Sequence, residues 1–228
     1  MAKKLKENPI IKRWEDKYEG LELFPENNKA IICGKIERDL DFNHRLPGTK
    51  IKIFKTRVKV TRNNEYDDYV PILIPETIID EIDIKGKWIR LAGTVITRRG
   101  RANNDHRFKA VAIFVNYYEL MDKSEVKYIK PINIVYIEGM VCKVEAMYST
   151  KADLVIGVKA KNGEECYYYL PTVAFGRKLE NFLALKHGDK IAFYAKFQSR
   201  QYTKRISETE VISKTAYELA TNDFRLLD

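Results

Sequence analysis

Two segments of the sequence combine basic side chains with aromatic ones, which is the mixture that binds a flexible polyanion. The segment 98–109 holds four arginines and one lysine around Gly100, with Asp105 as its only acidic residue. The segment 199–205 interleaves its cations with Tyr202. Cations neutralise phosphates, and aromatic rings stack on bases without reading their sequence. Both segments could instead be solvated hairpin tips, and this alternative stays open.

The candidate phosphate ligands extend beyond these two segments. Lys55, Arg57 and Lys59 lie opposite the apolar positions of one expected strand, so they form a row on one sheet face. Such a row suits a polyanion, and it would equally protect an exposed edge strand from aggregation. The full set is Arg98, Arg99, Arg101, Arg107, Lys109, Lys55, Arg57, Lys59, Arg177, Lys196, Arg200, Lys204 and Arg205.

Several aromatic residues share a strand face with polar neighbours. Tyr167 and Tyr169 alternate around Tyr168, so the first two point to one face and Tyr168 to the other, which we expect to be the core. Trp88 shares a face with Arg90. Trp88 could therefore be a stacking platform for a base or a contact between two parts of the chain.

Groups that could perform catalysis or bind a metal are sparse. His44, His106 and His187 are far apart, and the sequence contains no phosphate-binding glycine loop or nucleophile motif. The three cysteines lack a C-x-x-C pair, which favours free thiols in a reducing compartment. We therefore expect neither an enzyme nor a metal or cofactor site.

The charge of the chain points to nucleic acid. The formal net charge is +9, and the excess lies at +6 on residues 29–121 and +3 on 122–228, with none on 1–28. A folded basic surface attracts phosphates by releasing counterions. A soluble protein with many surface lysines would show the same net charge, so composition alone leaves both explanations open.

The sequence repeats itself at a period close to one hundred residues. Tyr69-Val70-Pro71 recurs as Tyr169-Leu170-Pro171, and Thr97-Arg98 recurs as Ser199-Arg200. A Tyr-Glu-Leu tripeptide follows each copy, at 118–120 and 217–219. The offsets of 100, 102 and 99 residues match a small domain and are too long for a solenoid repeat. The chain is therefore predicted to contain two tandem copies of one module.

The expected elements give each module the same order. Three strands, a short helix and two strands form the order of an OB fold, so we predict an all-β chain of two tandem five-stranded OB barrels with one short helix each. The expected division is 1–28 extension, 29–121 module 1, 122–132 linker, 133–221 module 2 and 222–228 tail. A short helix is expected between Pro9 and Gly20, and a phase change near Ile53-Phe54 predicts a β-bulge.

The second module resembles the bacterial single-stranded DNA-binding protein family. Three segments agree in order with family motifs over roughly 60 residues: Tyr169–Arg177 with its Phe175-Gly176 step, Gly188–Ile191, and Phe197–Tyr202. The resemblance implies sequence-nonspecific binding of single-stranded DNA on an OB fold, with stacking at Tyr169, Phe175 and Tyr202. Module 1 keeps Tyr69 but has Gly100 where Tyr202 would align. The stacking candidates are thus Tyr169, Phe175, Tyr202, Tyr167, Tyr69 and Trp88.

The resemblance has limits that shape the expected role. Replicative family members end in a long tail with an acidic, Phe-tipped end, and here the sequence ends shortly after the fold. We therefore expect DNA replication, recombination or repair without that recruiting tail, as in a plasmid or phage form. Family members usually assemble four OB folds, which predicts a homodimer. The N-terminus has no apolar run, which predicts a cytoplasmic chain. An RNA-binding OB protein and a primosome-type adaptor remain alternatives.

Overall fold

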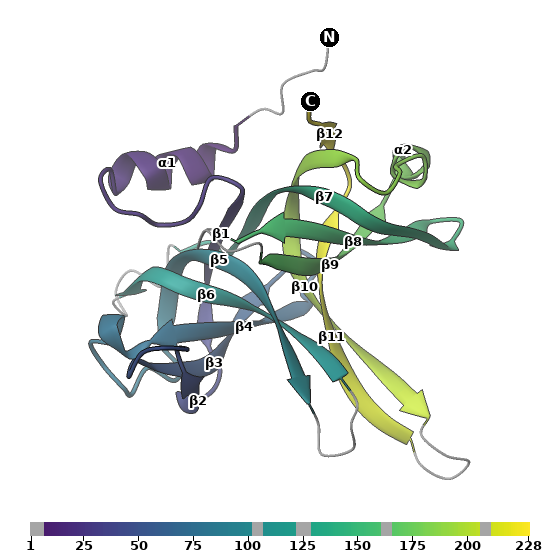
Figure 1. Ribbon diagram of the computed structural model, residues 1–228. Coiled ribbons are helices and arrows are strands. Elements are labelled where there is room, and N and C mark those ends of the chain that lie inside the picture. The colour runs from purple at the N-terminus through teal and green to yellow at the C-terminus, as the bar shows by residue number, and fades with distance from the viewer. Residues whose placement is uncertain (1–6, 102–106, 122–128, 161–165, 206–210) are drawn as a thin grey trace.

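The computed structural model describes residues 7–101, 107–121, 129–160, 166–205 and 211–228 (Figure 1). Strands dominate these segments. The elements in chain order are α1 (Pro9–Lys17), β1 (Asn28–Ile36), β2 (Asp41–Arg45), β3 (Lys52–Thr61), β4 (Asp67–Pro75), a 3-10 turn (Glu76–Ile78), β5 (Trp88–Arg101), β6 (Arg107–Met121), β7 (Ile132–Tyr148), β8 (Lys151–Lys159), β9 (Tyr167–Phe175), α2 (Leu179–Leu183), β10 (Lys190–Arg205), β11 (Val211–Thr221) and β12 (Arg225–Leu226).

The strands close into two five-stranded barrels of the same topology. In the first, neighbours follow the order β1-β5-β6-β4-β3, and β3 returns to pair with β1. In the second the order is β7-β10-β11-β9-β8, and β8 returns to β7. Each barrel has one parallel pair, β4–β6 or β9–β11, while its other pairs are antiparallel. This confirms the predicted fold class, an all-β chain with two tandem OB barrels.

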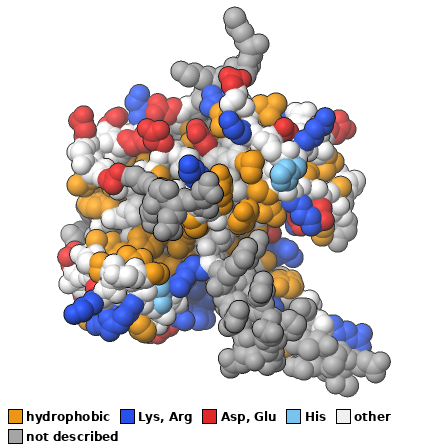
Figure 2. All heavy atoms as spheres, viewed as in Figure 1, with side chains coloured by type: hydrophobic (Ala, Val, Ile, Leu, Met, Phe, Trp, Pro, Cys, Tyr) orange, Lys and Arg blue, Asp and Glu red, His pale blue; other side chains and the backbone are white. Residues whose placement is uncertain are grey.

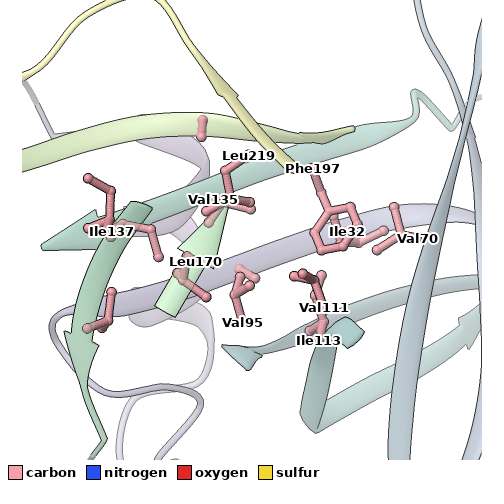
Figure 3. Packing of buried hydrophobic residues seen from close by; sticks show 14 of the residues in the cluster. Ile32, Val70, Val95, Val111, Ile113, Val135, Ile137, Leu170, Phe197 and Leu219 are labelled. Carbon is pink, nitrogen blue, oxygen red and sulfur yellow. The ribbon is translucent and has the colours of Figure 1, made fainter. Parts of the chain in front are cut away.

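The first strands of the two barrels pair with each other. Residues 28–33 of β1 lie antiparallel to residues 132–137 of β7. The barrels are therefore related by an approximate two-fold axis that passes through this pair. Their interiors form one continuous apolar cluster. Figure 3 shows part of it, with Val95 and Ile113 of module 1 and Leu170 and Phe197 of module 2.

One asparagine in each module joins two neighbouring strands at the point where they begin to separate: Asn28 joins β1 to β5, and Asn133 joins β7 to β10. Asn28 donates to the Val95 carbonyl at 2.8 Å and accepts from the Val95 N–H at 2.9 Å. Asn133 does the same for Phe197, at 2.7 Å in both directions. Each amide continues the ladder one step beyond the last backbone pair, so the backbone groups of β5 and β10 stay satisfied where the strands separate.

The N-terminal helix packs where its apolar stripe predicts. Pro9 and the Asn8 side chain, which accepts from the Ile10 N–H at 2.9 Å, start α1. Its Ile11 and Trp14 are buried against Ile31 and other residues of the β1–β7 sheet face. In the described part of the chain, no helix is both long and apolar enough to cross a membrane.

Three finer expectations about the elements can be compared with the structure. Residues 76–85, which the sequence predicts to be a short helix or a turn, contain only the 3-10 turn, since their β-branched isoleucines and scattered acids are poor helix formers. Leu183 of α2 is exposed, although its helical spacing from Leu179 predicts a place on the apolar face. The register shift near Ile53 and Phe54 lies in the neighbouring β2, between Phe42 and His44, while β3 pairs with β4 without interruption.

The Tyr-Glu-Leu repeat is a coincidence of sequence. In module 1, Ile113 of β6 pairs with Ile72 of β4. In module 2 the counterpart of Ile72 is Thr172 of β9, and Thr172 pairs with Leu219 of β11. The structural offset of this strand is thus 106 residues (219 − 113), not 99. The β10–β11 hairpin reaches further than β5–β6 before its turn, and the extra residues move the whole of β11 along the sequence.

Candidate nucleic-acid interface

Two long hairpins, β5–β6 and β10–β11, extend from the junction of the barrels toward the same side (Figure 1). A groove of about 770 Å³ lies between them. Its floor includes Pro71 and Pro171, the two prolines of the repeated Tyr-x-Pro motifs. The remaining lining residues come from β2, β3 and β4 and from both hairpins, so both modules build this groove.

The groove is basic and partly aromatic. The cations Lys55, Arg98 and Lys214 line it, and none of its described lining residues is acidic. Tyr202 and Tyr217 line the β10–β11 side. In Figure 2 acidic side chains gather over α1, away from the hairpins. A charge of +3 with no carboxylate among the described lining residues suits a chain of phosphates.

The two tyrosines of the groove have different surroundings. Tyr202 is 37% exposed, and the Arg200 guanidinium lies 5.9 Å from its ring centre. Tyr217 is half-buried, with its ring centre 6.2 Å from that of the core residue Phe197. Tyr202 can therefore stack on a base, while Tyr217 offers a ring edge held in place by the core.

Arg98 stands on the β5 side of the groove. Its guanidinium contacts His44 and lies 3.3 Å from the Asn43 side-chain oxygen. Burial, and then the charge of Arg98, hold the pKa of His44 below its usual value. The neutral form of His44 is therefore favoured at pH 7, and it adds no charge that would repel Arg98.

The repeated motifs meet each other across the junction. The Tyr69 N–H donates to Ser199 Oγ at 2.9 Å, and the Tyr169 N–H donates to Thr97 Oγ1 at 3.2 Å. Each tyrosine of a Tyr-x-Pro motif thus contacts the hydroxyl of the Thr/Ser-Arg pair of the other module. The approximate two-fold axis makes the contact reciprocal, which gives both motifs a structural reason to occur twice.

Only one of these two contacts is reinforced by charge. Asp68 is 1% exposed and receives two hydrogen bonds of 2.6 Å from Arg62. Its Oδ1 also accepts from the Ser199 N–H at 2.9 Å. At the equivalent contact, Tyr168 occupies the place of Asp68, since it directly precedes Tyr169 as Asp68 precedes Tyr69. We call Asp68, Arg62 and Ser199 the polar latch.

The cations beside the polar latch are paired with acids. Arg57 donates to both carboxylate oxygens of Glu37, and these hydrogen bonds hold the pKa of Glu37 below its usual value. Lys59 lies 2.9 Å from Asp67. The Arg57 guanidinium also lies 4.7 Å from the ring centre of Tyr69, covering one face of that ring. These pairs occupy the row predicted on β3, of which only Lys55 lines the basic groove.

Other predicted residues lie away from the groove. Trp88 is half-buried at the opposite end of β5, next to Met121 on β6. Phe175 is half-buried at the end of β9, and Arg177 and Lys196 are exposed outside the groove lining. Tyr167 and Tyr169 are exposed on β9 with their ring centres 6.5 Å apart. They could extend the binding surface over module 2.

The basic finger predicted at 98–109 is described only in part. Residues 102–106, which include His106, lie outside the described structure. The side chains of Arg99, Arg101, Arg107, Lys109 and Lys204 also lie outside it, although their backbones continue the two hairpins. Arg205 is exposed near the end of β10. The roles predicted for these cations therefore stay predictions.

Sequence reasoning missed Lys214 and Tyr217. They lie on β11, where the sequence shows only the Tyr-Glu-Leu repeat and no cluster of cations with aromatic residues. Lys214 pairs directly across from Tyr202 in the hairpin, so the known alternation of strand faces could have indicated it once the register was known.

Solved structures give an independent test of the fold. The single-stranded DNA-binding protein of Thermus aquaticus aligns with a TM-score of 0.62 at 12% identity, covering 88% of this chain and 93% of that one. A deletion variant of the same protein aligns with a TM-score of 0.61 at 15% identity, covering 88% and 95%. No family model and no curated protein sequence matches the chain. The chain therefore shares its fold, along nearly its whole length, with the single-stranded DNA-binding protein of Thermus aquaticus.

Proposed function

We propose that this protein binds single-stranded DNA without sequence preference, in the groove between its two hairpins. The observation that carries the proposal is the groove itself, which places Lys55, Arg98 and Lys214 around Tyr202 with no acidic residue in the described lining. The shared fold with a DNA-binding protein supports it. We further propose a role in DNA replication, recombination or repair, as a binding protein and not as an enzyme.

Both modules contribute to this interaction. Lys55 and Arg98 of module 1 and Lys214 of module 2 would neutralise phosphates, and Tyr202 of module 2 would stack on a base. Stacking contributes about 1–3 kcal/mol per base and tolerates any base, since each has an aromatic face. A single strand suits this site because its bases are free to leave one another, whereas a duplex keeps them paired inside.

Titration with fluorescently labelled oligo-dT at increasing salt tests the proposal. We expect log K to fall linearly with log salt, with a slope of about −0.7 per phosphate contacted, hence near −2 or steeper from the three described groove cations. Intrinsic tyrosine fluorescence should also be quenched. An affinity that does not change with salt would contradict the electrostatic part, and no binding at low salt would reject the function and favour a protein-interaction module.

Two finer properties need separate measurements. Competition between oligo-dT and oligo-rU of equal length separates DNA from RNA binding, because the 2′-hydroxyl is the main difference between them at one site. The homodimer remains our proposal for the assembly, and light scattering of the full chain decides it. A clean monomer mass would reject the dimer.

A further inference from the structure

A second hollow, of about 450 Å³, opens beside the groove. Three parts of the chain line it: the outer face of the module 1 sheet, residues between Glu22 and Asn28, and three residues of module 2, namely Lys159, Ala160 and Tyr168. Leu73, Ile96 and Arg98 line both the hollow and the groove, so the two spaces adjoin at these residues. We call the hollow the side pocket.

The walls of the side pocket are apolar and aromatic. Its aromatic residues are Phe24, Phe114 and Tyr168, with Leu46, Leu73 and Ile96 beside them. Leu73, Ile96 and Phe114 belong to a small apolar cluster that is separate from the shared barrel core. A concave, mostly apolar site with a few polar groups is typical of a ligand-binding pocket.

The polar groups of the side pocket favour an anionic ligand. Arg98 and Lys159 contribute two cations, and Glu22 is the single acidic residue among the described lining residues. His44, also in the lining, is neutral at pH 7 because the pKa of its ring is lowered by burial and by Arg98. Arg98 stands where the pocket joins the groove, so a phosphate bound to it would place neighbouring bases on either side.

We propose that the side pocket takes one base of the strand that lies in the groove, an inference that rests on the function proposed above. A strand whose phosphate contacts Arg98 can stack one base on Tyr202 and turn the next between Phe114 and Tyr168. An apolar peptide would fill the walls but would bring no anion for Arg98, which lines both the pocket and the groove. The excess of two cations over one carboxylate in the described lining therefore favours a nucleotide over a peptide.

Photocrosslinking tests this inference whatever register the strand adopts. Oligo-dT in which every thymine is replaced by 5-iodouracil is irradiated on the full chain, and crosslinked residues are identified by mass spectrometry of the digest. We expect crosslinks at Tyr168 or Phe114 in addition to those at Tyr202 or Tyr217. Tyr168→Ala should remove the pocket crosslinks, keep those in the groove, and weaken binding roughly tenfold.

Two further variants guard against trivial results. Phe42→Ala truncates an exposed aromatic residue of β2 that lines neither the pocket nor the groove, so it should keep the pocket crosslinks. Ala160→Leu narrows the pocket without removing an aromatic ring, so it should suppress them in a protein that melts normally. Crosslinks confined to the groove, with full affinity retained in Tyr168→Ala, would overturn the side pocket and leave the proposed function intact. Absence of any binding would instead reject the proposed function.

Discussion

Replacing Lys55, Arg98 and Lys214 together by glutamate should weaken binding of oligo-dT by at least about a hundredfold at moderate salt, and should lower the salt slope by about 2. These three side chains are the described cations of the groove, and no described lining residue is acidic. Each phosphate contact releases counterions, so losing three contacts removes that entropy gain, and reversing their charge adds repulsion. Fluorescence anisotropy across a salt series measures both quantities.

A matched control separates the effect of the groove cations on affinity from the effect of the net charge. Lys143, Lys178 and Lys190 are exposed and lie outside the groove lining, so changing all three to glutamate alters the net charge by the same amount. We expect this variant to lose much less affinity than the groove variant. Equal losses in the two variants would mean that the overall charge attracts DNA, and the groove would no longer be the site.

The sequence was sufficient to predict the fold because the element order and turn residues of an OB barrel are local signals. Pro71 fits this pattern, because it lies just before β4 begins its parallel pairing with β6 at Ile72, where a residue without a backbone N–H is tolerated. The helix of residues 9–17 followed from Pro9 and one apolar stripe. The offset of 106 residues between β6 and β11 could not be predicted, because the length of a hairpin depends on its pairing register and not on its composition.

The candidate site was harder to predict for a physical reason. Sequence alternation shows which side chains share a face, but it does not show which faces of two modules meet. Tyr69 looked like a stacking residue, yet the Arg57 guanidinium covers one face of its ring. Lys214 carried no motif, and only the register of β10 with β11 places it beside Tyr202. Charge pairing and contacts between modules are properties of the folded chain.

The motifs that drew attention as candidate binding residues also hold the modules together. Tyr69 and Ser199 meet at one junction, and Tyr169 and Thr97 meet at the other. The hydrogen bonds use the backbone N–H of each tyrosine, so the ring of Tyr169 is still exposed. One motif can therefore fix the relative position of the barrels with its backbone and offer its ring to a base.

Asp68→Ala should lower the free energy of unfolding by about 3–5 kcal/mol, the largest loss we expect from one side chain in the junction. Asp68 is 1% exposed, and its carboxylate receives hydrogen bonds from Arg62 and from the Ser199 N–H. Removing it leaves a half-buried guanidinium and a backbone N–H without partners, and both must then be satisfied by water that enters the junction. Urea unfolding measures the loss.

The neighbouring Asp67 provides the matched control for this measurement. Its carboxylate is more exposed and pairs with Lys59 and Thr61 at the surface, so Asp67→Ala should cost less than about 1 kcal/mol. A cost for Asp68→Ala as small as that of Asp67→Ala would contradict the polar latch.

Replacing both charges of the latch distinguishes a buried ion pair from a simple packing contact. The double variant Arg62→Leu with Asp68→Leu removes the guanidinium together with its carboxylate, so only the Ser199 N–H is left without its partner. It should therefore be more stable than Asp68→Ala, by roughly 1–3 kcal/mol, because no uncompensated charge remains in the junction. A double variant less stable than Asp68→Ala would contradict this explanation, because it would show that Arg62 stabilises the junction even without the Asp68 carboxylate. In either case the contact between Tyr169 and Thr97, which has no buried carboxylate, should be unaffected. Oligo-dT binding by the folded double variant then shows whether the groove needs the polar latch.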